Sequence, residues 1–230
     1  MTHILNNPAW HALTSGNRSL AHGSGPVRYF WSDVSPFAGL EENSVEQFDE
    51  LARLVPFDSP LAIVLPIATT LPAPWSIIQQ IAVWQMVYIA PLHKLPSATS
   101  VVQLGSADVP EMLKLTKLTN PGPFEHNTLR FGHYEGIYEG DRLIAMAGQR
   151  MHPRPYAEIS AVCTHPDFLG RGLASQLLVR QIHRIKAAGE IPFLHVKSEN
   201  SRAITVYRNL GFEKRKEVVI YIIQKISPTT

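Results

Sequence analysis

Residues 157 to 189 contain a strand-like run, a turn with two glycines and an amphipathic helix in direct succession, and this unit constrains the fold most. The run from Ala157 to Thr164 has the composition of a strand. The helix predicted after it carries an apolar stripe and is expected to end at Gly189, since glycine favours a helix C-terminus. The stripe consists of Leu173, Leu177, Leu178, Ile182 and Ile185. This succession predicts a strand-rich α/β fold, with α and β elements mixed around one sheet.

The glycines of the turn, Gly170 and Gly172, leave the N-terminus of the predicted helix open. Unpaired N–H groups and the helix dipole attract anions at such an end, and a residue without Cβ lets a pyrophosphate approach the backbone. Glycines also relieve a tight strand-to-helix turn in proteins that bind nothing. The turn alone therefore leaves both interpretations open.

A second helix is predicted after the strand Pro192–Val196, in the segment SENSRAITVYRNLGF, and Gly211 ends it. The residues that share its inward face are Ala203, Val206, Tyr207 and Leu210. A tyrosine at this spacing is commonly a core residue whose hydroxyl has found a partner. This helix indicates a binding site only when it is considered together with the glycine turn.

The run HPDFLGRGLASQLL resembles the acyl-CoA-binding motif of the GNAT superfamily of N-acetyltransferases. The pattern N-x-x-A-x-x-x-Y-x-x-x-G-F, from Asn200 to Phe212, is similar to the downstream motif of that family, and both occur in its order and spacing. The family usually has Arg or Gln where this sequence has Leu169, so one side-chain contact is missing while the loop backbone is retained. The resemblance implies a two-domain member with a GNAT fold of about six strands and acetyl-CoA as co-substrate.

The resemblance also implies a set of cofactor-binding residues. Backbone groups of Val162 and Thr164 are expected to pair with the pantetheine amides, as in strand addition by a ligand, and Asn200 to bind the pantetheine arm. The implied set is Val162, Cys163, Thr164, Leu169, Gly170, Arg171, Gly172, Leu173, Ala174, Ser175, Asn200 and Ala203.

The chemistry implied by the resemblance needs an acid and a base. Tyr207 matches the family position whose phenol lies near the thioester sulfur, and its ordinary pKa of about 10 suits an acid that protonates the departing thiolate. Glu158 is the predicted base for the attacking amine, directly or through water. A solvated or hydrogen-bonded strand residue is the alternative interpretation of Glu158, and Glu135 is a weaker candidate. Direct attack needs no acyl-enzyme, so Cys163 is expected to pack in the core.

The chain before residue 101 is interrupted by prolines and is predicted to form a separate unit. A segment with Pro, Ser and Thr over residues 91–100 suits a linker and places a domain boundary near residue 100. We predict a smaller α/β domain over residues 1–100, for which a diverged GNAT-like fold is one interpretation, and the GNAT domain over residues 101–230. Five prolines limit helix length in the first unit: Pro56, Pro60, Pro66, Pro72 and Pro74.

Several further elements follow from hydrophobic periodicity. Glu41 to Leu54 predicts a helix, and Leu61–Leu65 and Val83–Ile89 predict strands. Val101–Leu104 reads as a strand, and the Gly–Asp pair between Glu139 and Arg142 predicts a hairpin. A helix is predicted between this strand and this hairpin, and its apolar positions are Met112, Leu115 and Leu118.

Charge and composition exclude some classes of partner. With 21 Lys and Arg against 19 Asp and Glu, the formal net charge of +2 offers no excess of cations for a nucleic acid or an anionic membrane. The stretch Ile77 to Leu92 is interrupted by glutamines and is shorter than the roughly 20 apolar residues that span a bilayer. One cysteine and a start without a signal-peptide pattern predict a cytoplasmic location. The ten histidines show no metal-binding spacing, so no metal is predicted.

The sequence thus predicts transfer of an acetyl group from acetyl-CoA to the primary amine of a small molecule or peptide. Two alternatives stay open. One is a module that binds acyl-CoA as a sensor or scaffold without turnover, and the other is a conjugating enzyme of the glycine N-acyltransferase type that uses longer acyl groups. A homo-oligomer is compatible with all three.

Overall fold

One eight-stranded sheet organises the computed structural model, which describes residues 3–65, 70–95 and 101–226. Its strand order is β3-β10-β4-β9-β8-β7-β6-β5, and a separate two-stranded sheet pairs β1 with β2. Strands β8 and β9 run parallel while the other neighbours are antiparallel, so the predicted mixed sheet is confirmed. The strands are β1 Val27–Tyr29, β2 Ala38–Leu40, β3 Leu61–Leu65, β4 Trp75–Tyr88, β5 Val101–Gln103, β6 Glu135–Glu139, β7 Arg142–Gln149, β8 Tyr156–Thr164, β9 Ile191–Lys197 and β10 Phe212–Lys225.

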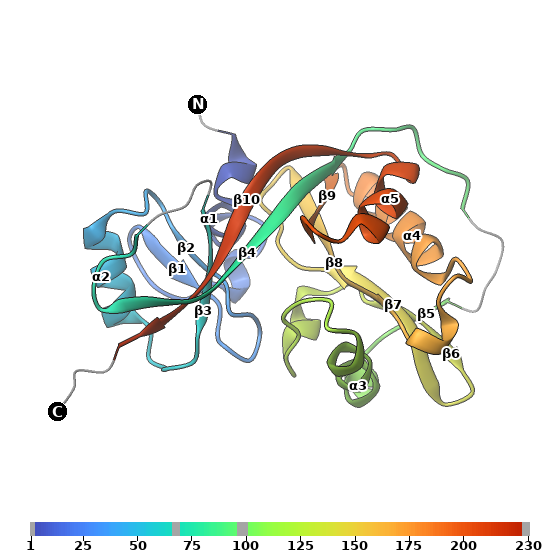
Figure 1. The fold of residues 1–230 in the computed structure, drawn as a ribbon, viewed down its shortest axis with the longest axis horizontal. Helices are drawn as coiled ribbons and strands as arrows, with labels where there is room; N and C mark the ends of the chain where they lie inside the picture. Colours follow the sequence, from blue (N-terminus) through green and yellow to red (C-terminus); the bar gives the residue numbers. More distant parts are fainter. Residues whose placement is uncertain (1–2, 66–69, 96–100, 227–230) are drawn as a thin grey trace.

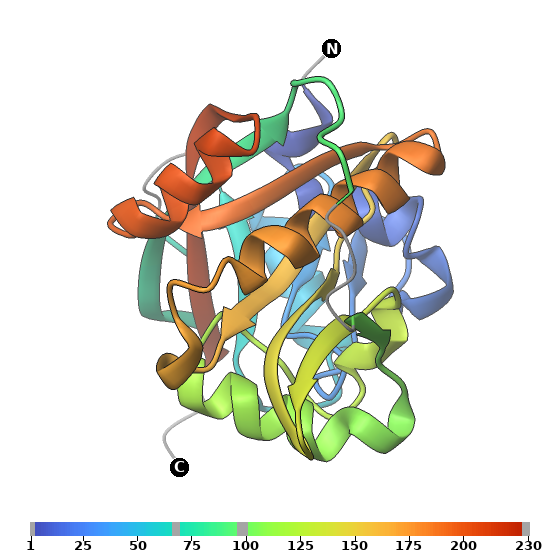
Figure 2. The same cartoon turned by 90° about the vertical axis from the view of Figure 1, so that its right-hand side faces the viewer.

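Helices cover both faces of the sheet. The α-helices are α1 Pro8–Thr14, α2 Val45–Leu54, α3 Val109–Thr119, α4 Leu173–Ala187 and α5 Ser201–Asn209. Short 3-10 turns lie at Ile4–Asn6, Arg18–Leu20, Ser106–Asp108, Thr128–Phe131 and Pro166–Phe168. Leu177 of α4 packs in one cluster with Ala145 and Ala147 of β7, whereas Met112 of α3 packs in another cluster with Met146, which lies between them on the same strand. Because neighbouring strand residues point to opposite faces, α3 and α4 lie on opposite sides of the sheet (Figure 2).

Strands β4 and β10 are the longest elements of the sheet and connect the two halves of the molecule (Figure 1). They pair from Phe212 opposite Tyr88 to Lys225 opposite Trp75, and β3 adds to the other edge of β10. Strands from the first hundred residues therefore belong to the same sheet as β6 to β9. The domain boundary stays a prediction, and its residues 96–100 lie outside the described part of the chain.

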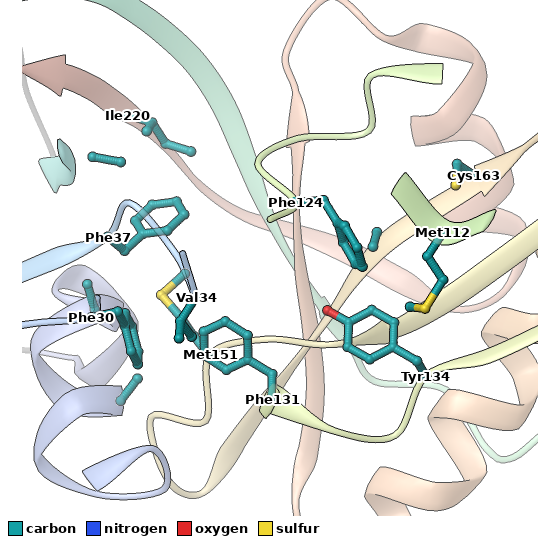
Figure 3. Packing of buried hydrophobic residues seen from close by; sticks show 14 of the residues in the cluster. Phe30, Val34, Phe37, Met112, Phe124, Phe131, Tyr134, Met151, Cys163 and Ile220 are labelled. Carbon is teal, nitrogen blue, oxygen red and sulfur yellow. The ribbon is translucent and has the colours of Figure 1, made fainter. Parts of the chain in front are cut away.

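The largest buried cluster also draws on both halves (Figure 3). Phe30, Val34 and Phe37 come from the first half, and they pack in one cluster with Phe131 and Tyr134. The rings of Phe30 and Phe131 meet edge to face with centroids 5.1 Å apart. This packing fixes residues 30–37 against the strands that follow residue 134.

Most predicted elements are present, with two changes of boundary. The helix expected from Glu41 begins at Val45, because the Ser44 side chain accepts a hydrogen bond from the Gln47 N–H and caps the helix there. The strand expected over Val83–Ile89 is only the second half of β4, since pairing with β10 extends it back to Trp75 through the exposed Gln79 and Gln80. The predicted hairpin is confirmed by the antiparallel pair β6 and β7.

Candidate functional site

Strands β8 and β9 pair over their first three residues and then separate. Their parallel ladder, within the described residues, ends where Glu158 lies opposite Phe193. Shortly afterwards β8 bulges against β7, and Ala161 adopts a left-handed conformation with φ of 52°. The segment from Val162 to Thr164 is paired with β7 on one edge, and its other edge has no ladder partner among the described strands.

A hollow of about 670 Å³ opens where these strands separate, and we call it the first hollow. It lies between the end of β8, the turn before α4 and the inward side of α5. Its lining includes Tyr207 and every predicted cofactor-binding residue except Arg171. Arg171 instead lies over the ring of Phe168, 4.6 Å from its centroid, and faces Glu139 at 3.7 Å.

The N-terminus of α4 points its unpaired donors into the first hollow. Gly170 and Gly172 have φ of 80° and 73°, and no side chain caps the helix. The first helical hydrogen bond runs from the Gln176 N–H to the Gly172 carbonyl at 3.1 Å, so the N–H groups of residues 173–175 have no helical acceptor. A Cβ at either glycine would meet nothing within 4 Å. Open space in front of bare donors suits a diphosphate.

Two polar side chains of the first hollow differ in their bonding. Asn200 uses its Oδ1 to cap α5, accepting from the Ala203 N–H at 3.0 Å. The Thr164 hydroxyl is buried and has no hydrogen-bond partner among the described residues. A buried hydroxyl without a partner is costly, so this group is available to a ligand.

Tyr207 and Cys163 line both the first hollow and a second one beside it. Burial raises the pKa of the Tyr207 phenol to about 12, and the neighbouring Cys163 adds to the shift. Burial likewise raises the pKa of the Cys163 thiol to about 12. Both groups keep their protons at neutral pH, so Tyr207 can donate a proton and Cys163 is not a thiolate nucleophile.

The second hollow measures about 700 Å³ and meets the first at Tyr207 and at the end of β8. Its walls come from β4, β10, the loop after α3 and residues near β2. The apolar wall residues include Phe37, Ile81, Val83, Pro123, Ile220 and Ile222. The charged or polar lining residues are Arg150, His195, Lys197, Glu199, Thr119, Asn120, Thr164, Asn200 and Tyr207.

Glu158 is buried behind Arg150 and His195 and is not among the described lining residues of either hollow. Its carboxylate accepts two hydrogen bonds from Arg150, at 2.6 and 3.0 Å, and contacts His195 Nδ1 at 2.8 Å. Burial alone would raise its pKa, but Arg150 and His195 outweigh this and lower it to about 2. A carboxylate with this pKa is a weak base.

Glu135, the weaker candidate for the base, lies in a different network. Its buried carboxylate accepts hydrogen bonds from Arg180 at 2.7 Å and Gln181 at 3.0 Å, which joins β6 to α4. It is not among the described lining residues of either hollow. Its contacts are those of a structural ion pair.

Sequence reasoning missed several residues of the two hollows. Arg202 lines the first hollow, and its place two residues after Asn200 in the motif was a signal that could have found it. Arg150 and His195 carried no local signal, because they are brought together by the pairing of strands. No group of three or more potential metal ligands is found among the described residues. None of the helices in the described part is long and apolar enough to cross a membrane.

The chain is similar to several known proteins. Residues 134–221 match the family model described as FR47-like protein. A solved structure of an acetyltransferase assigned to the GNAT family, from Novosphingobium aromaticivorans, is 34% identical, covers 98% of this chain and 100% of its own, and superposes with a TM-score of 0.90.

Curated relatives match a shorter part. The N-alpha-acetyltransferase RimI of Mycobacterium tuberculosis is 33% identical over 86 residues, which are 36% of this chain and 52% of that protein. The mycothiol acetyltransferase of Actinosynnema mirum is 33% identical over 84 residues, which are 36% of this chain and 28% of that protein. The chain thus matches about a quarter to a half of the length of these relatives.

Proposed function

The chain belongs to the GNAT family of acetyltransferases, and we propose that it transfers an acetyl group from acetyl-CoA to a primary amine by direct attack. One observation carries the proposal: the two hollows meet at Tyr207, where β8 has separated from β9. One hollow offers the donors that a diphosphate needs, and the other has room for an acceptor. The names of RimI and mycothiol acetyltransferase support acetyl as the transferred group.

We assign acetyl-CoA to the first hollow. The N–H groups at the start of α4 would hold the diphosphate, and the free edge of β8 from Val162 to Thr164 would pair with the pantetheine amides. The unpartnered Thr164 hydroxyl adds a group that fits a polar ligand. Arg171 lies outside the lining, so we assign it no contact in the arrangement described.

We assign Tyr207 the role of the acid. Its phenol stays protonated because burial raises its pKa to about 12, and it lies at the junction of the two hollows. A phenol there can donate to the thiolate that leaves when the amine attacks the thioester. The Cys163 thiol, whose pKa is also raised, stays protonated beside it, which supports direct attack over an acyl-enzyme.

For Glu158 we propose a positioning role in place of direct proton abstraction. Its oxygens are occupied by Arg150 and His195, and its low pKa makes it a poor proton acceptor. Glu158 thereby holds the side chains of Arg150 and His195 in the wall of the second hollow. Proton loss from the amine is then left to solvent.

The proposal is tested by calorimetry with acetyl-CoA, CoA and ADP on the full chain, followed by thiol release in the presence of amines. Saturable binding of acetyl-CoA and amine-dependent release of CoA support an enzyme. Binding without release for any amine supports the alternative, a sensor or scaffold. Absence of binding contradicts the assignment of the first hollow.

A further inference from the structure

The second hollow combines an apolar wall with Arg150 and His195, whose side chains are both hydrogen-bonded to Glu158. Resting on the proposed function, we propose that the acceptor is a primary amine on an apolar body that enters this hollow as the neutral amine. This selects amines with a pKa well below that of a lysine side chain, such as α-amines next to a carbonyl. The following contacts carry the proposal.

The wall that faces the acceptor is made by side chains of two neighbouring strands. Ile81 and Val83 of β4 lie beside Ile220 and Ile222 of β10, with which they pair directly or diagonally in the ladder. Phe37 extends this surface from the first half of the chain, and its ring lies 4.7 Å from the Arg150 guanidinium carbon. An apolar group placed here is removed from water and gains binding free energy in proportion to its area.

The charge of Arg150 is already balanced. Its side chain is only 9% exposed, and its Nε and Nη2 both donate to the equally buried Glu158. Both carboxylate oxygens of Glu158 are used in this pair and in the contact with His195. No uncompensated carboxylate therefore faces an ammonium group deep in the hollow, as far as the described lining residues go.

The hydrogen bonds of the His195 ring are set by its two neighbours, Gln85 and Glu158. The Gln85 amide has a fixed orientation, because its oxygen accepts from Arg215 at 2.6 Å and its nitrogen donates to the Leu5 carbonyl at 2.7 Å. The same nitrogen lies 3.1 Å from His195 Nε2, which must therefore accept. The proton of His195 is then on Nδ1, where it is donated to Glu158.

The other titratable groups of the lining are neutral or lie in solvent. Tyr207 and Cys163 keep their protons. Lys197 and Glu199 are exposed and of opposite charge. An ammonium that left water for this hollow would lose its hydration without gaining a buried carboxylate among the described lining residues, which is unfavourable. A neutral amine avoids this loss and is also the form that attacks.

The test uses four amines with acetyl-CoA and the full chain: phenylalaninamide, phenethylamine, glycinamide and spermidine. At pH 7 the neutral fraction of an α-amine with pKa near 8 exceeds that of an amine with pKa near 10.4 by on the order of 100-fold. We expect kcat/KM for phenylalaninamide to exceed that for phenethylamine at least about ten-fold at pH 7. The ratio of the kcat/KM values for these two amines should decrease steadily from pH 7 to pH 9. Phenylalaninamide should also exceed glycinamide by about ten-fold or more, since only it has an apolar group to bury.

A variant pair locates the apolar contact. Ile222→Ala removes part of the wall and should lower the ratio of phenylalaninamide to glycinamide several-fold, with glycinamide as the internal standard. Val219→Ala, a half-buried change on the same strand that packs in another cluster, should leave the ratio unchanged. An unchanged ratio in Ile222→Ala overturns the assignment of the wall.

Two further results overturn the inference while the proposed function stands. One is preferred use of spermidine, and the other is equal use of phenylalaninamide and phenethylamine at pH 7. If acetyl-CoA fails to bind in calorimetry, the proposed function itself fails. If acetyl-CoA binds and none of the four amines releases thiol, the inference on the acceptor is overturned.

Discussion

The two hollows are built in different ways from the same sheet. Apart from Leu118 and Thr119, every described lining residue of the first hollow lies between Val162 and Tyr207. The second hollow is assembled from residues as far apart in the chain as Phe37 and Ile222. A site built from one continuous stretch of sequence can be recognised as a sequence motif, whereas a site assembled by strand pairing cannot.

The chemistry of the two hollows differs in the same way. The first offers donors without partners, at the start of α4 and at Thr164, and therefore suits an anionic, hydrogen-bonding ligand. In the second, the buried side chains of Arg150 and His195 are bonded to Glu158, and apolar side chains of β4 and β10 form one wall. The first hollow thus recognises polar groups, and the second excludes charge.

Tyr207→Phe tests the junction between the hollows and has the largest expected effect. Loss of a positioned acid lowers turnover by about 10²- to 10⁴-fold. Acetyl-CoA affinity should change little, because the ring is kept and only the hydroxyl is removed. Single-turnover thiol release and calorimetry measure the two quantities. Unchanged turnover would remove Tyr207 from the acid role.

Glu158→Gln tests the bonded network of the second hollow. Removing one partner of a buried ion pair should lower the free energy of unfolding by about 3–5 kcal/mol at pH 7, because Arg150 is left buried and unpaired. The double variant Arg150→Met with Glu158→Gln removes both charges and should recover much of this loss. Urea unfolding measures the stability of both variants. A Glu158→Gln variant as stable as the parent would contradict the ion pair between Glu158 and Arg150.

The same pair predicts how stability depends on pH. The pKa of Glu158 is lowered from 4.5 to about 2 on folding, so the unfolded chain binds its proton first as the pH falls. Its contribution is complete above pH 4.5 and is lost progressively as the pH falls toward 2. The unfolding free energy of the parent should therefore fall more steeply over this range than that of Glu158→Gln.

Most residues that line the first hollow could be grouped from the sequence, because glycines, a helix start and a strand end are local features. The glycine turn with Gly170 and Gly172 precedes α4 as expected, and Tyr207 lies on the inward side of α5. The bulge at Ala161 was not foreseen, since neither alanine nor its neighbours favour a positive φ.

The fold class was predictable for the same reason, and the long strands were not. The exposed Gln79 and Gln80 break the alternation that would identify a strand, and only the ladder with β10 keeps this part of β4 extended. Glu158 shows the same limit. Its strand position was predicted, but its partners Arg150 and His195 come from elements that only the sheet brings together.

Gly172→Val tests the anion site of the first hollow. A side chain in the open space before α4 should lower CoA affinity by on the order of 100-fold, since a charge-assisted hydrogen bond to backbone N–H groups contributes about 1.5–3 kcal/mol. The matched control is Gly189→Val, at the other end of α4. That glycine has φ of 74° and equally open surroundings, so the backbone strain is the same while the hollow is untouched. Equal CoA affinity in both variants would contradict the assignment of the diphosphate.

Thr164→Val has the smallest expected effect and separates binding from folding most cleanly. The Thr164 hydroxyl has no partner in the part of the chain that the structure describes, so its removal should leave the free energy of unfolding nearly unchanged. Thr128 is the matched control, because its buried hydroxyl donates to the Val34 carbonyl and accepts from the Glu125 N–H. Thr128→Val should lower stability by about 1–3 kcal/mol and leave CoA affinity intact.

If the Thr164 hydroxyl contacts the ligand, Thr164→Val should weaken acetyl-CoA binding by about two- to ten-fold, the equivalent of one hydrogen bond. Calorimetry on both threonine variants gives the affinities, and urea unfolding gives the stabilities. Unchanged affinity in Thr164→Val would show that this hydroxyl takes no part in binding. The first hollow would then recognise its ligand through backbone groups alone, and the contrast with the side-chain walls of the second hollow would be sharper still.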